Sequence, residues 1–307
     1  MAELIQQLIN ALLLGCNYTL VAIGFSLFFG ALNVIHFSHG DVCIFGAFSI
    51  LLLHTLATSL GWAGELHPAL YGLGLVLAAV VVTGVAGVVL EQAVIKPFRH
   101  QPLLMVLVST VMLGSIIREA IRLWYPRGND PQIFVSLLPR DTFNVGEVLL
   151  SVDSLIIIAI TVLMIVLLFM FIERTRMGAA IRAISQDGEA ATMMGVNMNK
   201  TIAVTFLVGS ALGAVAGVLI GSYNNIIRFD MGLMLGVKGF SAAVVGGLGN
   251  VHGAIIGGLI LGFIETFVAG VVPGGSPYAD VFSFLVVILF LVFRPYGVLG
   301  EKVAEKV

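Results

Sequence analysis

The chain has 307 residues, of which 59% are hydrophobic and only 10% are charged, and its mean hydropathy is +1.09. In soluble domains about a quarter of all residues are charged. This composition therefore excludes a soluble globular protein and predicts a polytopic membrane protein. The formal net charge of −2 provides no basic surface for nucleic acid. Cys16 and Cys43 lie in apolar stretches, where we expect small buried side chains and no disulfide.

The amino-terminal half alternates apolar segments with short polar interruptions. Residues 8–30 are long enough for a span, which needs about 20 apolar residues. The run NVIHFSHGD, residues 33–41, follows. Polar side chains at membrane depth are costly and are usually functional, so we predict a functional break in this run. Further spans are expected at residues 42–60, 68–94 and 103–123, with a short basic cytoplasmic loop at 96–99.

The polar residues of the first break are compatible with three kinds of chemistry. His36, His39 and Asp41 could form a metal site if an i, i+3 histidine pair faces one side of a helix. A second interpretation, which we favour, is that His39 and Asp41 satisfy the backbone and cap a helix that begins at Val42. An intramembrane enzyme would use His39, Asp41, His252 or Glu265 as acid or base, but the sequence has no G-x-S-x-G or H-E-x-x-H motif.

The middle of the chain contains its longest polar connection. Residues 124–150 contain three prolines and charges of both signs, which is typical of an external loop, and they are too few for a separate domain. A span at residues 151–172 then returns the chain to the opposite side of the membrane.

Residues 173–200, which we call the elbow, carry four basic residues in a short interhelical connection. Because Lys and Arg collect on the cytoplasmic side, this cluster predicts a cytoplasmic elbow. The four are Arg174, Arg176, Arg182 and Lys200. Gly178, Gly188 and Gly195 separate stretches of helix formers, so we expect short helices at residues 179–184 and 189–194.

The carboxy-terminal half is rich in glycine. Residues 201–222 have a glycine at every fourth position from Gly209 to Gly221, a stripe that favours close helix packing. Residues 238–265 have too many glycines for one regular span, so we expect a short half-helix, a break at 246–252 and a second helix. The last span is expected at 281–293. Three basic residues should hold the tail in the cytoplasm, namely Arg294, Lys302 and Lys306.

Three islands of this sequence resemble one family. In the elbow, Glu189, Ala190, Ala191 and Gly195 spell E-A-A-x-x-x-G, which resembles the motif by which permease subunits of ATP-binding-cassette importers dock onto their ATPases. The longer string from Arg176 to Gly195 is similar to the loop of branched-chain amino-acid permeases of the LivH type. The other islands are residues 33–41 with Gly46, and residues 242–265, which include G-G-L-G-N-x-x-G-A-x-x-G-G-L-I-L-G-x-x-E.

The resemblance extends over nearly the whole chain, with one departure. The family usually has N-[FL]-A-H-G-[DE] at the first break, and here His36 and Ser38 replace the asparagine and the alanine. This departure leaves the substrate open. Branched-chain amino acids are the first choice, and urea, short amides or another small solute are alternatives. An ion-gradient-driven secondary transporter is a further alternative.

The resemblance implies a type II-like, all-α transmembrane bundle of about 8–10 spans with broken or re-entrant helices. The whole chain, residues 1–307, would be one permease domain with the elbow as its coupling loop. Partners would be a second, LivM-like permease, two LivG/LivF-like cytoplasmic ATPases and a periplasmic binding protein, in the bacterial inner membrane. The sequence has no G-x-x-x-x-G-K-[ST] motif, so we expect no enzyme activity and no cofactor in this chain, with ATP hydrolysis on the partners.

The candidate site residues fall into two groups. Those expected to line the substrate pathway lie at the two breaks: Asn33, His36, Ser38, His39, Gly40, Asp41, Gly246, Gly247, Gly249 and Asn250. Those expected to couple to the ATPase lie in the elbow: Arg176, Gly178, Arg182, Asp187, Glu189, Ala190, Ala191 and Gly195. We expect the two breaks to meet near the membrane centre, because backbone groups left unpaired in lipid would be costly.

Overall fold

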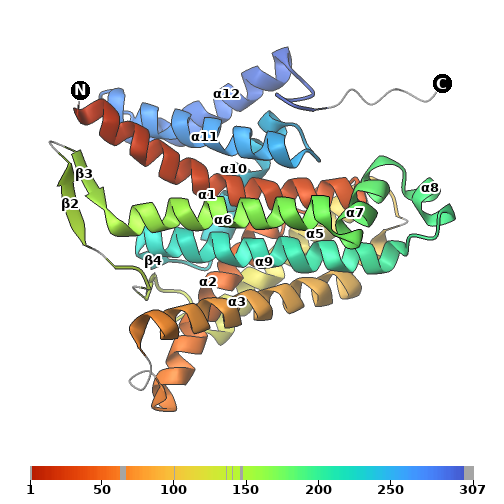
Figure 1. The fold of residues 1–307 in the computed structure, drawn as a ribbon, viewed down its shortest axis with the longest axis horizontal. Coiled ribbons are helices and arrows are strands. Elements are labelled where there is room, and N and C mark those ends of the chain that lie inside the picture. Colours follow the sequence, from red (N-terminus) through yellow and green to blue (C-terminus); the bar gives the residue numbers. More distant parts are fainter. Residues whose placement is uncertain are drawn as a thin grey trace.

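The computed structural model describes residues 2–62, 67–99, 101–135, 137–139, 141–145 and 148–300. Within these ranges, eight helical segments are long and apolar enough to cross a membrane, and they run side by side in one bundle (Figure 1). The spanning helices are α1 (Ala2–Leu32), α2 (His39–Ser59), α3 (Pro68–Leu90) continued by η2 (Glu91–Ile95) and α4 (Lys96–Phe98), α5 (Leu103–Trp124), α6 (Val152–Arg174), α9 (Met198–Asn224), α11 (Val251–Val271), and α12 (Ala279–Phe293) preceded by η3 (Ser276–Tyr278). The prediction of a helical membrane bundle is confirmed.

The two ends of the bundle differ in structure. At one end, the hairpin end, β2 (Thr142–Val145) pairs antiparallel with β3 (Val148–Ser151), with Thr142 opposite Ser151. A second small ribbon pairs β1 (Gln132–Ile133) with β4 (Ile226–Ile227). At the other end, the elbow end, lie α7 (Arg176–Gln186) and α8 (Gly188–Met193) (Figure 1). The connection at 124–150, expected as a loop, therefore carries short strands.

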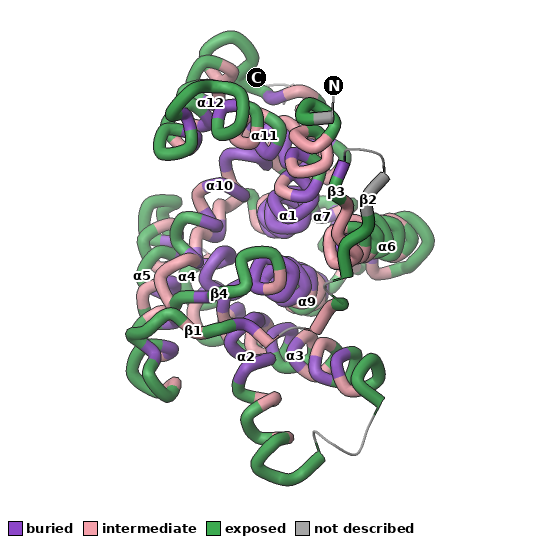
Figure 2. The backbone as a smooth tube through the Cα atoms, turned by 90° about the vertical axis from the view of Figure 1, so that its left-hand side faces the viewer, coloured by how far each residue is buried: buried purple, intermediate pink, exposed green. Residues whose placement is uncertain are grey.

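Helices α1 and α9 form the centre of the bundle. In their most apolar windows 83% and 72% of residues are buried, against 17% in α6 and in α12. Figure 2 shows the buried backbone of α1 and α9 inside and the exposed backbone of α6 and α12 outside. Cys16 and Cys43 are buried free thiols in this core, as expected.

The predicted glycine stripe of α9 is confirmed. A Cβ on Gly209 would collide with the ring of Phe28, and a Cβ on Gly217 would collide with the carbonyl group of Cys43. The stripe therefore brings the backbone of α9 close to α1 and α2. Small residues serve the same purpose at membrane helix contacts generally, because they let van der Waals surfaces meet along the backbone.

Helix α10 (Met231–Gly246) is the expected half-helix, although it starts earlier than residue 238. It packs between α1 and α2, and its glycines permit the approach: a Cβ on Gly239 would collide with Val21, and one on Gly236 would touch Gly40. His252 was expected inside the second break, but it lies in the first turn of α11. The second break is therefore shorter than predicted.

The basic segment at 96–99 was expected as a loop, and its first three residues are helical instead. A single wide turn, η2, joins them to α3, and Glu91 at its start is 1% exposed. Arg99 pairs with Glu91 and also donates to Asn199 Oδ1 at 2.9 Å. This contact places the segment at the elbow end. Lys302 and Lys306 of the predicted tail lie outside the described residues.

Candidate functional site

The first break turns the chain back into the bundle. Helix α1 ends at Leu32, but His39, the first residue of α2, packs edge-on against Phe25 and Phe28 at ring-centroid distances of 5.2 and 5.1 Å. A Cβ on Gly24 would collide with the His39 ring. Gly24 lies eight residues before the last residue of α1, Leu32. At 1.5 Å per residue, α2 therefore starts roughly 12 Å inward from the end of α1. Such a re-entrant start agrees with the predicted broken helices.

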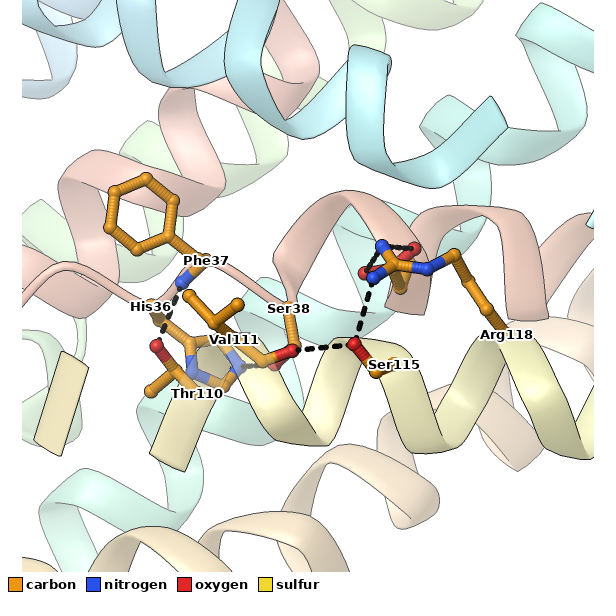
Figure 3. Close-up of polar contacts among 8 residues, drawn as sticks. His36, Phe37, Ser38, Thr110, Val111, Ser115 and Arg118 are labelled. Carbon is orange, nitrogen blue, oxygen red and sulfur yellow. Dashed lines mark hydrogen bonds and ion pairs between the residues drawn. The ribbon is translucent and has the colours of Figure 1, made fainter. Parts of the chain in front are cut away.

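Some polar groups of this break are satisfied by α5 and some within the break itself. The Phe37 N–H donates to Thr110 Oγ1 at 3.3 Å, and Ser38 Oγ lies 3.1 Å from His36 Nε2. Figure 3 shows Thr110, Ser115 and Arg118 on one helix, facing the segment that carries His36 and Ser38. The backbone groups freed by the break are therefore covered by protein, which is the condition for irregular backbone at membrane depth.

Asp41 forms an ion pair and does not cap the helix. Arg118 Nη1 donates to both oxygens of Asp41, at 3.0 and 2.9 Å, and Arg118 Nη2 donates to Ser115 Oγ at 3.0 Å. The expectation that Asp41 and His39 cap a helix beginning at Val42 is wrong, because α2 begins at His39 and Ser38 is its N-cap residue. Sequence-local reasoning missed Arg118, which lies 77 residues away.

The two histidines do not share a helix face. His36 precedes α2 and its ring packs against Phe28 and Phe206, each at a centroid distance of 5.1 Å, whereas His39 starts α2. Among the described residues no group of three His, Cys, Asp or Glu side chains has the geometry of a metal site. The acid–base candidates do not converge either, because His252 and Glu265 are 13 residues apart on α11, or roughly 20 Å.

The second break is closed by backbone bonds with the end of the described chain. Gly247 and Gly249 have φ of +109° and +86°, a region that favours glycine. Asn250 caps α11 by accepting from the Gly253 N–H at 3.1 Å, and its Nδ2 donates to the Leu299 carbonyl at 2.9 Å. The Leu299 N–H in turn donates to the Gly246 carbonyl at 3.0 Å.

The second break lies at the elbow end and not near the centre of the bundle. A Cβ on Gly249 would lie 3.5 Å from the Phe29 ring, and one on Gly30 would lie 3.7 Å from the Gly249 carbonyl. Since α11 is a full span that starts directly after the break, the break lies at the end of the bundle where that span begins. The first break instead contacts the opposite half of α10, where a Cβ on Gly40 would collide with Gly232.

The elbow contains the two short helices that were predicted. Thr175 caps α7 by accepting from the Gly178 N–H at 3.0 Å, and Asp187 caps α8 by accepting from the Glu189 and Ala190 N–H groups at 3.1 and 3.0 Å. Gly178 packs so tightly against α6 that a Cβ would collide with the Ile172 carbonyl, to which Arg182 also donates.

Helix α8 ends in a glycine cap and presents an open apolar tip. Gly195 has φ of +88°, and the Val196 N–H donates to the Ala191 carbonyl at 3.0 Å, which ends the helix as predicted. Met193 and Met194 are 87% and 86% exposed. Within the part of the chain that the structure describes, nothing lies within 4 Å of a Cβ built on Gly195. Flexible thioether side chains on a rigidly capped turn suit contact with a second protein.

A cavity of about 380 Å³, lined by apolar and a few polar or charged side chains, was not anticipated from the sequence. It is lined by α1, α2, α9, α10 and α11, toward the hairpin end of α9, whose last residues Tyr223 and Asn224 line it. Lys238 and Glu265, which line it, form an ion pair with Nζ and Oε1 2.8 Å apart. An ionisable residue inside a span is a signal of function that the sequence did contain.

Comparison with known proteins identifies the family. The model of the family described as "branched-chain amino acid transport system / permease component" matches residues 7–291. The chain belongs to this permease family. No solved structure matches it.

The permease is similar over its full length to two curated relatives. It is 36% identical to the high-affinity branched-chain amino acid transport system permease protein BraD of Pseudomonas aeruginosa, with 99% of the chain and 98% of the relative covered. It is 34% identical to the permease protein LivH of Escherichia coli K12, with 99% and 97% covered. The fructose import permease protein FruG of Bifidobacterium longum is 26% identical, over 62% of the chain and 58% of the relative.

Membership of the family settles the general role. The permease is a multi-pass membrane protein, and its relationship to bacterial permeases implies the inner membrane. A permease component is the non-catalytic part of a transport system. Membership of such a system implies, in general, that the permease has ATPase and binding-protein partners.

Proposed function

We propose that this permease imports branched-chain amino acids in an ATP-driven complex with a second, LivM-like permease, two LivG/LivF-like ATPases and a periplasmic binding protein. The observation that carries the proposal is the full-length similarity to BraD and LivH, whose names state this substrate. FruG is a partial and more distant relative, so a different small solute such as urea or a short amide is the alternative.

The elbow end faces the cytoplasm in this proposal. Basic residues gather there from separate parts of the chain, and such an excess is typical of cytoplasmic loops. They are Lys96, Arg99, Arg174, Arg176, Arg182, Lys200 and Arg294. The cavity near the hairpin end then opens toward the side from which a periplasmic binding protein delivers its solute.

The two breaks border the pathway at different depths. Gly232, which packs against Asp41 of the first break, is flanked by Met231, and Met231 and Leu235 line the cavity from α10. The first break therefore supports the helix that forms the cavity wall. The second break, beside Gly30 at the elbow end, would border the exit toward the cytoplasm.

Reconstitution of the whole complex tests the function. Liposomes with both permeases and both ATPases, supplied with binding protein and leucine outside, should take up leucine only when ATP is inside. The permease alone should take up none under a proton or sodium gradient. Gradient-driven uptake by the permease alone would establish the secondary-transporter alternative, and ATP-driven uptake of urea in place of leucine would establish the alternative substrate.

We further propose that α8 couples the permease to an ATPase. Gly195→Leu should reduce leucine uptake at least tenfold while the ATPases still bind, because the new side chain stands beside the exposed Met193 and Met194. The loss of one contact of about 1.4 kcal/mol corresponds to that factor. Uptake and ATP hydrolysis are measured in the same liposomes.

Gly61→Leu is the matched control for this variant. Gly61 also has a positive φ, +80°, and no atom of the described residues lies within 4 Å of a Cβ built there, but it follows α2 away from the elbow. It therefore carries the same backbone strain without the docking contact. Equal uptake by the two variants would show that α8 does not dock.

A further inference from the structure

A network of charges lies at the cavity: Lys238 and Glu265 line it and are largely buried, and Asp280, whose side chain is 44% exposed, pairs with Lys238 from outside the lining. Lys238, 9% exposed on α10, lies 2.8 Å from Glu265 on α11 and 2.6 Å from Asp280 on α12, measured from Nζ to the carboxylate oxygens. The Tyr18 hydroxyl donates to Glu265 Oε2 at 2.9 Å. Taking charges out of water is costly, and a buried ion pair seldom stabilises a fold more than apolar residues would. The network therefore points to a function other than stability.

Lys238 has no remaining donor for a ligand. An ammonium group has three N–H donors, and three acceptors surround this one: Glu265, Asp280 and the Tyr18 hydroxyl, the last at 3.1 Å. Each carboxylate has about four acceptor sites, so acceptors remain. One positive and two negative groups also leave a net negative charge. The cluster thus attracts a cationic donor.

A second acceptor on the cavity wall has no partner. Asn17 lines the cavity, is 1% exposed, and donates from Nδ2 to the Leu13 carbonyl at 3.1 Å. A carbonyl oxygen only accepts, so this bond fixes the orientation of the amide. Its Oδ1 has no hydrogen-bond partner among the described residues. A buried acceptor without a donor is costly, and a bound ligand with N–H groups would supply one.

The rest of the cavity is apolar. Six aliphatic or thioether side chains line it: Leu14, Ile44, Ile220, Met231, Met234 and Leu235. The volume of about 380 Å³ lies in the range of about 300–1,000 Å³ usual for small-molecule sites. An apolar wall opposite a few fixed polar groups is the usual composition of such a site.

We propose that this cavity binds an aliphatic α-amino acid, with its ammonium group held by Glu265 and Asn17 Oδ1 and its side chain against the apolar wall. The choice of an amino acid rests on the proposed function. Lys238 is a positioning residue, since it holds Glu265 in place while the carboxylate keeps free acceptor sites. Glu265 and Asn17 then determine specificity for an amine.

Protection of an introduced cysteine tests the site directly. In the complete importer, with Cys16 and Cys43 replaced, Met234→Cys provides a thiol on the cavity wall. Leucine and 3-methylbutylamine, which share the ammonium group, should slow its labelling by a maleimide. The compound 4-methylpentanoate, which is leucine without that group, should not. Equal protection by 4-methylpentanoate would overturn the assignment to an amine.

Two substitutions test the named acceptors. Glu265→Gln should raise the leucine concentration for half-protection at least tenfold, because hydrogen bonds to charged groups are the stronger ones. Glu119→Gln is the matched control, since Glu119 pairs with Arg122 on the exposed face of α5 and lies outside the cavity. If Glu265→Gln fails to assemble, Asn17→Ala leaves every ion pair in place and should still raise that concentration several-fold.

The outcomes separate this inference from the proposed function. Unchanged half-protection in both acceptor variants overturns the site, and so does an importer that takes up leucine with ATP but shows no protection. Protection by leucine that needs Glu265 or Asn17 supports the site. An importer that binds leucine in this way but does not take it up overturns the proposed function alone.

Discussion

The two breaks look alike in sequence, since each has glycine, histidine and asparagine between apolar helices, but they are stabilised in different ways. The first is held by side chains far away in sequence: Thr110 accepts from Phe37, and Arg118 pairs with Asp41. The second is held mainly by its own backbone, by the Asn250 cap and by bonds with Leu299. The same polar signature thus stands for a tertiary contact in one place and a capped turn in the other.

This difference follows from how deeply each break lies within the helix bundle. The first break reaches roughly 12 Å into the bundle from the end of α1, at 1.5 Å per residue, where water cannot satisfy polar groups. A charged partner from another helix is then needed for Asp41, whose side chain is 4% exposed. The second break lies at the end of a span, where a turn with two left-handed glycines suffices.

The comparison predicts its largest effect at Arg118. Arg118→Leu leaves Asp41 as an uncompensated buried charge, which should cost about 3–5 kcal/mol. The melting temperature of the purified permease in detergent should fall accordingly. Arg122→Leu, one turn along α5, removes a pair whose side chains are 41% and 50% exposed, and it should cost about 0–1 kcal/mol.

Removal of the uncompensated charge of Asp41 distinguishes an electrostatic cause of the destabilisation from a loss of packing. Asp41→Asn added to Arg118→Leu should recover much of the melting temperature, because the amide carries no charge to be compensated. If Arg118→Leu melts like Arg122→Leu, the first break does not depend on its distant ion pair, and the contrast between the two breaks is lost.

Local features of the fold were predictable from the sequence. The span lengths, the glycine stripe of α9 and the two elbow helices all follow from residue patterns within one segment. Gly195, for example, ends α8 with a positive φ because a glycine suits the left-handed position after a helix.

Long-range pairs were not predictable in the same way. Arg118 was expected inside an ordinary span, and nothing local assigns it to Asp41. Lys238 and Glu265 are the first and last residues of the glycine-rich segment 238–265, but their contact depends on the packing of α10 against α11. The depth of the second break was also missed, because a glycine pattern shows where a helix stops and not how deep that point lies.

A smaller effect is expected at Asn250, which caps α11 and also binds the Leu299 carbonyl. Asn250→Ala should cost about 0.5–2 kcal/mol for the cap, plus roughly 0.5–1.5 kcal/mol for the second bond. Asn197→Ala is the control, because Asn197 caps α9 by accepting from the Lys200 N–H at 3.0 Å and should cost the cap alone. Hydrogen exchange at the Leu299 amide, which donates to Gly246, should speed up in Asn250→Ala and not in Asn197→Ala. A melting-temperature loss in Asn250→Ala as large as that of Arg118→Leu would mean that the second break, too, is held by more than its own cap and tail.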